Sequence, residues 1–262
     1  MSYYNNKQTN LNETILTNNR YNNSNNTKEQ KKSNHDNNQP KIYFPNEIDF
    51  DNFTILDKIV REQQIGSWSA RILYNKQILK IQTPILLTAF DLTPHIYKNA
   101  KRAKYSLCLS LDKTIDGVLD LIGLVNEIDA TALRTFIDNK DTPEIKEARF
   151  VKVIKYSDTN KDTNSTFPPT IRCNLVNNVT HFKCAITKNG VNVKDTTINH
   201  ITNLLKKGTK VRAIIELNPV WFNGLEYLDK TTNKKLKSWG ISWRIVALDI
   251  VKPNIQFRTT NV

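Results

Sequence analysis

The chain has 262 residues, 38 Lys and Arg against 25 Asp and Glu, a formal net charge of +13 and three cysteines. So few cysteines exclude a disulfide scaffold, and we find neither a signal peptide nor an apolar run long enough to span a membrane, so we expect a soluble, intracellular, non-secreted protein with reduced thiols. The basic charge favours a polyanionic partner, and nucleic acid fits better than a membrane because no basic amphipathic helix is visible.

Residues 1–40 form a polar tract in which 13 residues are asparagine. Such a composition cannot bury enough apolar area to offset the entropy of ordering, so we predict a disordered Asn-rich arm. We expect one domain over residues 41–255 and a short tail over residues 256–262.

Strands are predicted in the first half of that domain. Residues 67–74 and 105–111 alternate apolar and polar side chains, and Asn75-Lys76 predicts a tight turn into residues 77–82. The linker before the second of these strands ends in a basic cluster, Lys101, Arg102 and Lys104.

Apolar residues recur every three or four positions from Ile115 to Phe136, which predicts an amphipathic helix. Asp112, Asp116 and Asp120 lie in its opening turns. Carboxylates at this spacing could bind a divalent cation, but acidic residues are favoured at a helix N-terminus anyway, and no second acidic motif supports a metal site.

Residues 150–156, 171–175 and 181–187 read as further strands, and Asn189-Gly190 is a strong hairpin signal. Thr196 or Thr197 can cap a short helix after that hairpin, and Gly208 is well placed to end this helix.

The region from Lys206 to Val251 carries most of the functional signal. Residues 209–217 alternate, which predicts a strand with an apolar inner face (Val211, Ala213, Ile215, Leu217) and a basic outer face (Lys210, Arg212). Residues 238–251 alternate as well, and their period changes near Val246, so we expect the far end to be buried on both faces. The connection between the two strands contains Trp221-Phe222 and a lysine-rich run, residues 230–237.

Aromatic rings beside cations suit a single nucleic-acid strand, because bases stack on rings and phosphates pair with ammonium groups. The alternative is that the tryptophans belong to the core, since large rings are mostly buried. Trp239 and Trp243 share a face with Ile241 and Ile245, which favours the core for these two.

Catalytic and zinc sites find little support. Cys173, His181 and Cys184 lack a second cysteine pair and a fourth ligand, and Cys173 with His200 has no nucleophile signature. Phosphate-binding loops, nucleophile elbows and H-E-x-x-H motifs are missing. We therefore expect neither a cofactor nor an enzyme.

The order of elements shows no regular alternation of strand and helix. It favours a mainly β fold with inserted helices, an OB-like (oligonucleotide-binding) five-stranded barrel with extra hairpins and one long amphipathic helix.

Several stretches then match a known pattern: ILYNKQILKIQTP, KYSLCLSLDK, FPPTIRCNL, ITKNGVNV, and GTKVRAIIELNPVWF with WGISWRIVALDIV. Over residues 65–251 the chain resembles the OB-fold single-stranded DNA-binding proteins of certain phages and giant nucleocytoplasmic DNA viruses. The resemblance implies a replication protein that coats single strands without sequence preference, often as a dimer. Phage members end in an acidic tail that recruits replication partners, whereas this chain ends in FRTTNV.

Our hypothesis is therefore a sequence-independent single-stranded DNA-binding protein, with RNA as a second candidate ligand, that acts in viral DNA replication, recombination or repair, inside the replication compartment of a host cell if the chain is viral. The residues predicted to stack on bases or hold phosphates are Trp221, Phe222, Trp239, Trp243, Tyr74, Lys101, Arg102, Lys104, Lys210, Arg212, Lys234, Lys235, Lys237 and Arg244. Among them the connection, Trp221-Phe222 with Lys234 to Lys237, is the favoured stacking site. Two alternatives stay open: a virion structural protein with a basic genome-facing surface, and a nuclease that uses the three aspartates with a metal.

Overall fold

The computed structural model describes residues 41–56, 59–62, 66–96, 102–157, 167–229 and 233–252. The predicted arm (1–40), the predicted tail (256–262) and Lys101 lie outside these residues. No helix within the described ranges is both long enough and apolar enough to cross a membrane.

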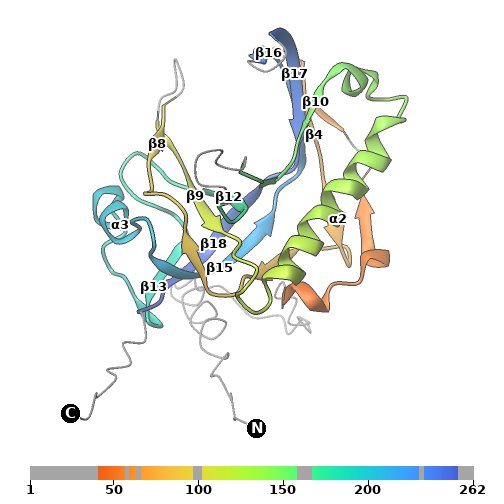
Figure 1. Cartoon of the computed structure of the whole chain (residues 1–262). Coiled ribbons are helices and arrows are strands. Elements are labelled where there is room, and N and C mark those ends of the chain that lie inside the picture. Colours follow the sequence, from red (N-terminus) through yellow and green to blue (C-terminus); the bar gives the residue numbers. More distant parts are fainter. Residues whose placement is uncertain are drawn as a thin grey trace, which may run out of the picture.

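A ring of strands closes into a barrel (Figure 1). β15 (Lys210–Leu217) pairs with β7 (Leu86–Thr88), β7 pairs with β9 (Lys104–Ser110), and β9 pairs with β12 (Thr170–Leu175). β12 then pairs in parallel with β18 (Trp243–Ile250), which returns to β15. β6 (Lys80–Gln82) also pairs with β15, so β6 and β7 together form the first barrel strand. This is the OB-like barrel that the order of elements predicted.

Alternation decides which side chains fill the barrel. The predicted inner residues of β15 are at most 2% exposed. In β18 one extra residue, Val246, lies opposite the step from Ile214 to Ile215, which makes a β-bulge. Because of the bulge, Ile245 and Leu248 both join the main core, while Ala247 packs with Ile214 in a separate small cluster. The predicted change of period near Val246 is confirmed.

A second sheet stands beside the barrel, and it is assembled from three distant parts of the chain. Its order is β10 (Arg149–Val151), β17 (Lys234–Gly240), β16 (Val220–Asp229), β4 (Ser67–Ala70) and β3 (Val60–Glu62). The connection between β15 and β18 is thus a long β-hairpin, β16–β17. The strand predicted over residues 238–251 is two strands, since β17 ends at Gly240 and β18 begins at Trp243.

Helix α2 (Val118–Ile137) is the predicted amphipathic helix, and its apolar side packs on the second sheet through aromatic rings. Trp68 stacks on Phe222 with ring centroids 5.6 Å apart, and Phe136 meets Trp239 edge to face at 6.3 Å. These rings form the apolar layer between helix and sheet.

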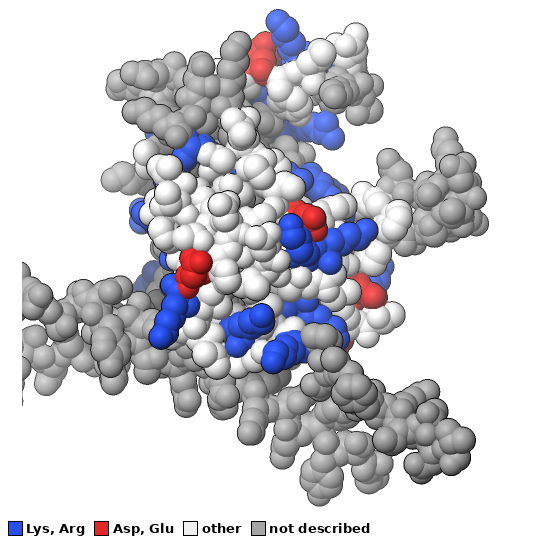
Figure 2. All heavy atoms as spheres, turned by 90° about the vertical axis from the view of Figure 1, so that its left-hand side faces the viewer, with Lys and Arg blue, Asp and Glu red and all other residues white. Residues whose placement is uncertain are grey.

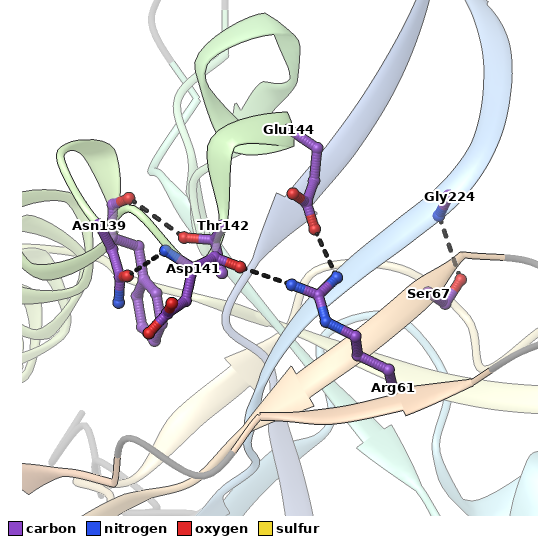
Figure 3. A network of polar contacts seen from close by, with 8 residues as sticks. Arg61, Ser67, Asn139, Asp141, Thr142, Glu144 and Gly224 are labelled. Carbon is purple, nitrogen blue, oxygen red and sulfur yellow. Dashed lines mark hydrogen bonds and ion pairs between the residues drawn. The ribbon is translucent and has the colours of Figure 1, made fainter.

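Figure 3 shows how the second sheet is tied to the segment after α2. The Arg61 guanidinium on β3 donates to the Glu144 carboxylate at 2.9 Å and to the backbone oxygen of Asp141. On the other side, the backbone amide of Gly224 donates to the Ser67 hydroxyl at 3.1 Å, which joins β16 to β4. The hairpin β16–β17 is therefore held by polar contacts as well as by the ring layer.

Two predicted strands are each divided between two sheets. Residues 67–74 form β4 and β5 (Ile72–Tyr74), and residues 150–156 form most of β10 and β11 (Ile154–Lys155). The predicted hairpin turn at Asn189-Gly190 is confirmed, with both residues at positive φ. The predicted cap is also present, since the Thr197 side chain accepts from the His200 amide at the start of α3 (Ile198–Leu204). The remaining elements are β1 (Ile42–Tyr43), β2 (Phe53–Ile55), β8 (Pro94–His95), β13 (Ala185–Lys188), β14 (Val191–Asn192) and the 3-10 helices η1 (Pro45–Glu47), η2 (Phe50–Asn52) and η3 (Pro143–Glu147).

Candidate nucleic-acid interface

The outer face of β9 and β12 is polar and, in the part of the chain described, free of carboxylates. Leu107 and Leu109 point into the barrel, and the side chains between them point outward together with those of the facing strand. Cross-strand partners on this face include Cys108 with Arg172 and Ser106 with Asn174. The complete outward set is Lys104, Ser106, Cys108, Ser110, Thr170, Arg172 and Asn174.

A hollow of about 700 Å³ lies beside this face, between the β10–β11 segment and the hairpin β16–β17. In Figure 1, β10, β16 and β17 rise together on one side of β9 and β12, and β8 rises on the other. The lining combines cations and aromatic rings and contains no carboxylate: Arg149, Phe150, Val151, Lys152, Ile154, Lys155, Tyr156, Asn223, Tyr227 and Ser238.

Cations from three strands approach one another at the hollow. Partial burial lowers the pKa of Lys155, and the like charges of Arg149 and Arg172 lower it further, against the opposing influence of the Asp129 carboxylate. Since these cations repel one another, an incoming anion is favoured here. The arrangement is suited to holding phosphates.

Behind the hollow, α2 contributes a buried carboxylate. Asp129 is 4% exposed, and its Oδ2 accepts a hydrogen bond from the Val153 amide at 3.0 Å, which fixes the bend between β10 and β11. Its Oδ1 is buried with no hydrogen-bond partner in the described structure. Burial raises the pKa of Asp129 to about 6, although the Val153 bond and the charges of Lys152 and Lys155 lower it. Asp129 therefore holds the segment that carries the two lysines.

Trp221 is the one predicted stacking residue that is partly exposed, and it lies beside this hollow. It sits on the same face of β16 as Asn223, which lines the hollow. Its ring lies over Gly240, since the ring atom Cζ2 is 3.5 Å from the point where a Cβ on Gly240 would stand. On the far side of Gly240 is Val151, another lining residue.

Four other predicted stacking residues are buried. Phe222, Trp239, Trp243 and Tyr74 are 3%, 1%, 0% and 4% exposed, so bases cannot reach their rings. The prediction that they stack on bases is wrong for this structure, because the rings fill the barrel, the layer under α2, and a cluster with Tyr43 and Phe53. The alternative that Trp239 and Trp243 belong to the core is confirmed.

The predicted cations are dispersed over several surfaces. Lys234 and Lys235 are exposed on β17, with Lys237 half-buried beside them. Arg102 donates to the backbone oxygen of Asn177 at 2.9 Å, and Lys104 begins β9, at the end of the polar face away from the hollow. Figure 2 views the molecule from the side of Figure 1 that carries α3 and β8, and Lys and Arg are more prominent there than Asp and Glu.

Three predicted cations do not join the interface. Arg244 forms an ion pair with the buried Glu216, which also lies 3.5 Å from the Lys80 ammonium group. Lys210 and Arg212 lie on the outer face of β15, a strand that pairs with neither β9 nor β12. Arg212 lines a different hollow together with Asp116 and Asp120. The basic outer face of β15 is therefore a separate surface.

Sequence reasoning missed three cations that line the hollow, Arg149, Lys152 and Lys155, and it missed Arg172 on the adjacent face of β12. One signal was available for Arg172, which alternates with the apolar Ile171 and Cys173 and so had to point outward from a predicted strand. The others come together only because β10 pairs with β17, a contact between residues that lie far apart in the sequence.

Among the described residues, no three or more His, Cys, Asp or Glu side chains lie close enough to hold a metal ion. Asp112 accepts hydrogen bonds from the amide and hydroxyl of Thr114, which assigns it to a local turn. Cys173 and Cys184 are buried, and burial raises the pKa of the Cys184 thiol to about 12.

No protein-family model and no curated protein matches this sequence. Solved structures of similar fold include the single-stranded DNA-binding protein from bacteriophage Enc34 in complex with single-stranded DNA (15% identity, 77% of this chain and 99% of that chain, TM-score 0.38). A C-terminal truncation of the same phage protein (14% identity, 76% and 97%, TM-score 0.40) and the single-stranded DNA-binding protein of bacteriophage T7 (14% identity, 67% and 87%, TM-score 0.35) are also similar. At these identities and TM-scores the likeness supplies no argument about this chain.

Proposed function

We propose that this protein binds single-stranded DNA without sequence preference, in the hollow between β10–β11 and the hairpin β16–β17 and along the outer face of β9 and β12. One observation carries the proposal: a hollow lined by three cations and no carboxylate opens beside the second and third strands of an OB-like barrel. In OB folds this face and the loops beside it bind oligonucleotides.

The aromatic side chains favour a single strand over a duplex. Tyr156, Tyr227 and Trp221 lie in or beside the hollow and are each at least partly exposed. A ring can stack only on an unpaired base, whereas cations alone would bind either form of DNA. The proposed role is binding without catalysis, and it includes no metal or cofactor.

The biological setting is also part of the proposal. The sequence resemblance to phage and giant-virus proteins supports a role in viral DNA replication, recombination or repair, within an infected cell. A dimer and binding to RNA belong to the same hypothesis.

The test compares oligo-dT with a mixed-sequence duplex of equal length, by fluorescence anisotropy over a series of salt concentrations. We expect tighter binding to the single strand, and an affinity that falls linearly with salt on logarithmic axes because phosphate contacts release counterions. Equal affinity for the duplex would instead support a virion protein that neutralises packaged genome, and absence of binding at low salt would refute the proposal.

A further inference from the structure

Two of the most exposed aromatic side chains in the described structure lie at a second hollow. Tyr156 and Phe167 are 57% and 65% exposed, and exposed rings of this size are unusual because their burial is favourable. Both line a hollow of about 340 Å³, whose other lining residues are Leu111, Asp112, Lys113, Ser157, Pro168 and Pro169.

The two rings are held on a common frame. The Ser157 hydroxyl donates to the backbone oxygen of Phe167 at 2.9 Å, which joins the residue after Tyr156 to the residue that carries the second ring. On the other wall, the Leu111 amide donates to the backbone oxygen of Pro169 at 2.7 Å. Proline fixes its own φ, so the Pro168-Pro169 segment adds stiffness. The hollow is therefore a built feature of the fold.

Tyr156 connects this hollow to the cationic one, since it lines both. The second hollow also carries the exposed Lys113, while the carboxylate of Asp112 is engaged by the Thr114 amide at 3.0 Å and hydroxyl at 2.8 Å. A flat apolar group joined to an anion could therefore contact the rings and prolines of this hollow, while its anion contacts Lys113 or the cations of the first hollow. An unstacked nucleobase on a phosphate backbone has this chemistry.

We propose that the hollow between Tyr156 and Phe167 is a base-binding subsite, in which one base of the bound strand stacks on these rings while its phosphates continue into the cationic hollow. This inference rests on the proposed function and extends its site. It assigns a role to two aromatic residues that the sequence did not single out.

The test is Phe167→Ala, with Phe50→Ala as the matched control. Phe50 is also an exposed phenylalanine and lines neither hollow. Loss of one stacking ring is expected to weaken oligo-dT binding about 5-fold to 150-fold, and Tyr156→Ala should act in the same direction. Phe167→Trp should keep the affinity, because it keeps a ring, and anisotropy with a labelled oligonucleotide measures each variant.

Because Phe167 is exposed, Phe167→Ala and Phe167→Trp should unfold at the temperature of the wild type, and circular dichroism checks every variant, including Phe50→Ala, for folding. If the wild type binds and Lys155→Glu weakens it, but Phe167→Ala binds as tightly as Phe50→Ala, the subsite is refuted and the proposed function stands. If the wild type itself fails to bind, both are refuted.

Discussion

Asp129 is the residue whose environment differs most from that of an ordinary side chain of its type. It is a carboxyl group buried on α2, with one oxygen bonded to the Val153 amide and the other without a partner. Its pKa is raised from 3.8 to about 6 in the folded protein, so the folded state binds a proton more tightly than the unfolded chain. The stabilising contribution of this proton binding to the free energy of unfolding is fully present below about pH 4 and is lost as the pH rises through 6.

Asp129→Asn should therefore raise the free energy of unfolding at pH 8, by up to about 3 kcal/mol for a pKa shift of this size. The gain should shrink as the pH falls toward 4.5, where the native carboxyl group is itself protonated. Urea titrations at several pH values measure this, with the exposed Asp120→Asn on the same helix as control. A difference that does not change with pH would contradict the role of burial.

At the residue scale, sequence reasoning separated some aromatic residues and not others. Trp239 and Trp243 could be assigned to the core because they alternate in phase with Ile241 and Ile245. The sequence could not decide which of Trp221 and Phe222 is exposed, because alternation defines two faces of a strand without saying which one faces solvent. Only the packing of Phe222 against Trp68 under α2 decides it.

At the scale of elements, alternation predicted β9, β12 and β15, and apolar spacing predicted α2. Alternation did not reveal that two predicted strands are each divided between two sheets, at Arg71 and at Lys152–Val153. The apolar–polar pattern continues through these residues although the strands on either side of them pair with different partners. The hairpin β16–β17 could not be predicted from the sequence either, since its apolar face is covered by a helix from elsewhere in the chain. These features build the hollow, which explains why its residues were missed.

A substitution at Gly240 tests the close contact between β10 and the hairpin β16–β17. A Cβ at this position would stand 2.7 Å from the backbone oxygen of Val151, closer than side chains tolerate. Gly240→Ala should lower the free energy of unfolding by about 1–3 kcal/mol and loosen the wall of the hollow. Gly123→Ala is the control, because nothing lies within 4 Å of its added methyl group and alanine favours the helix. Thermal unfolding compares the two, and equal stability of both variants would contradict the close approach.

At the scale of the whole molecule, charge is unevenly distributed along the chain. Segment 111–147 holds 4 Lys and Arg against 9 Asp and Glu, whereas residues 204–262 hold 11 against 4. Sequence reasoning placed the basic site on β15 and on the hairpin connection. The structure instead collects Arg149, Lys155 and Arg172 from an insertion and a barrel strand.

Charge reversal tests most directly whether the DNA binds at the cations beside the hollow or at the basic face of β15. Oligo-dT affinity should be measured by anisotropy for Arg172→Glu and Lys155→Glu, with Lys210→Glu as the matched control on the outer face of β15. The first two variants are expected to bind at least about 5-fold more weakly and to reduce the salt slope by about one each, while the control binds like the wild type. The contrary result, weakening by Lys210→Glu alone, would move the DNA to the face of β15 and contradict the site described.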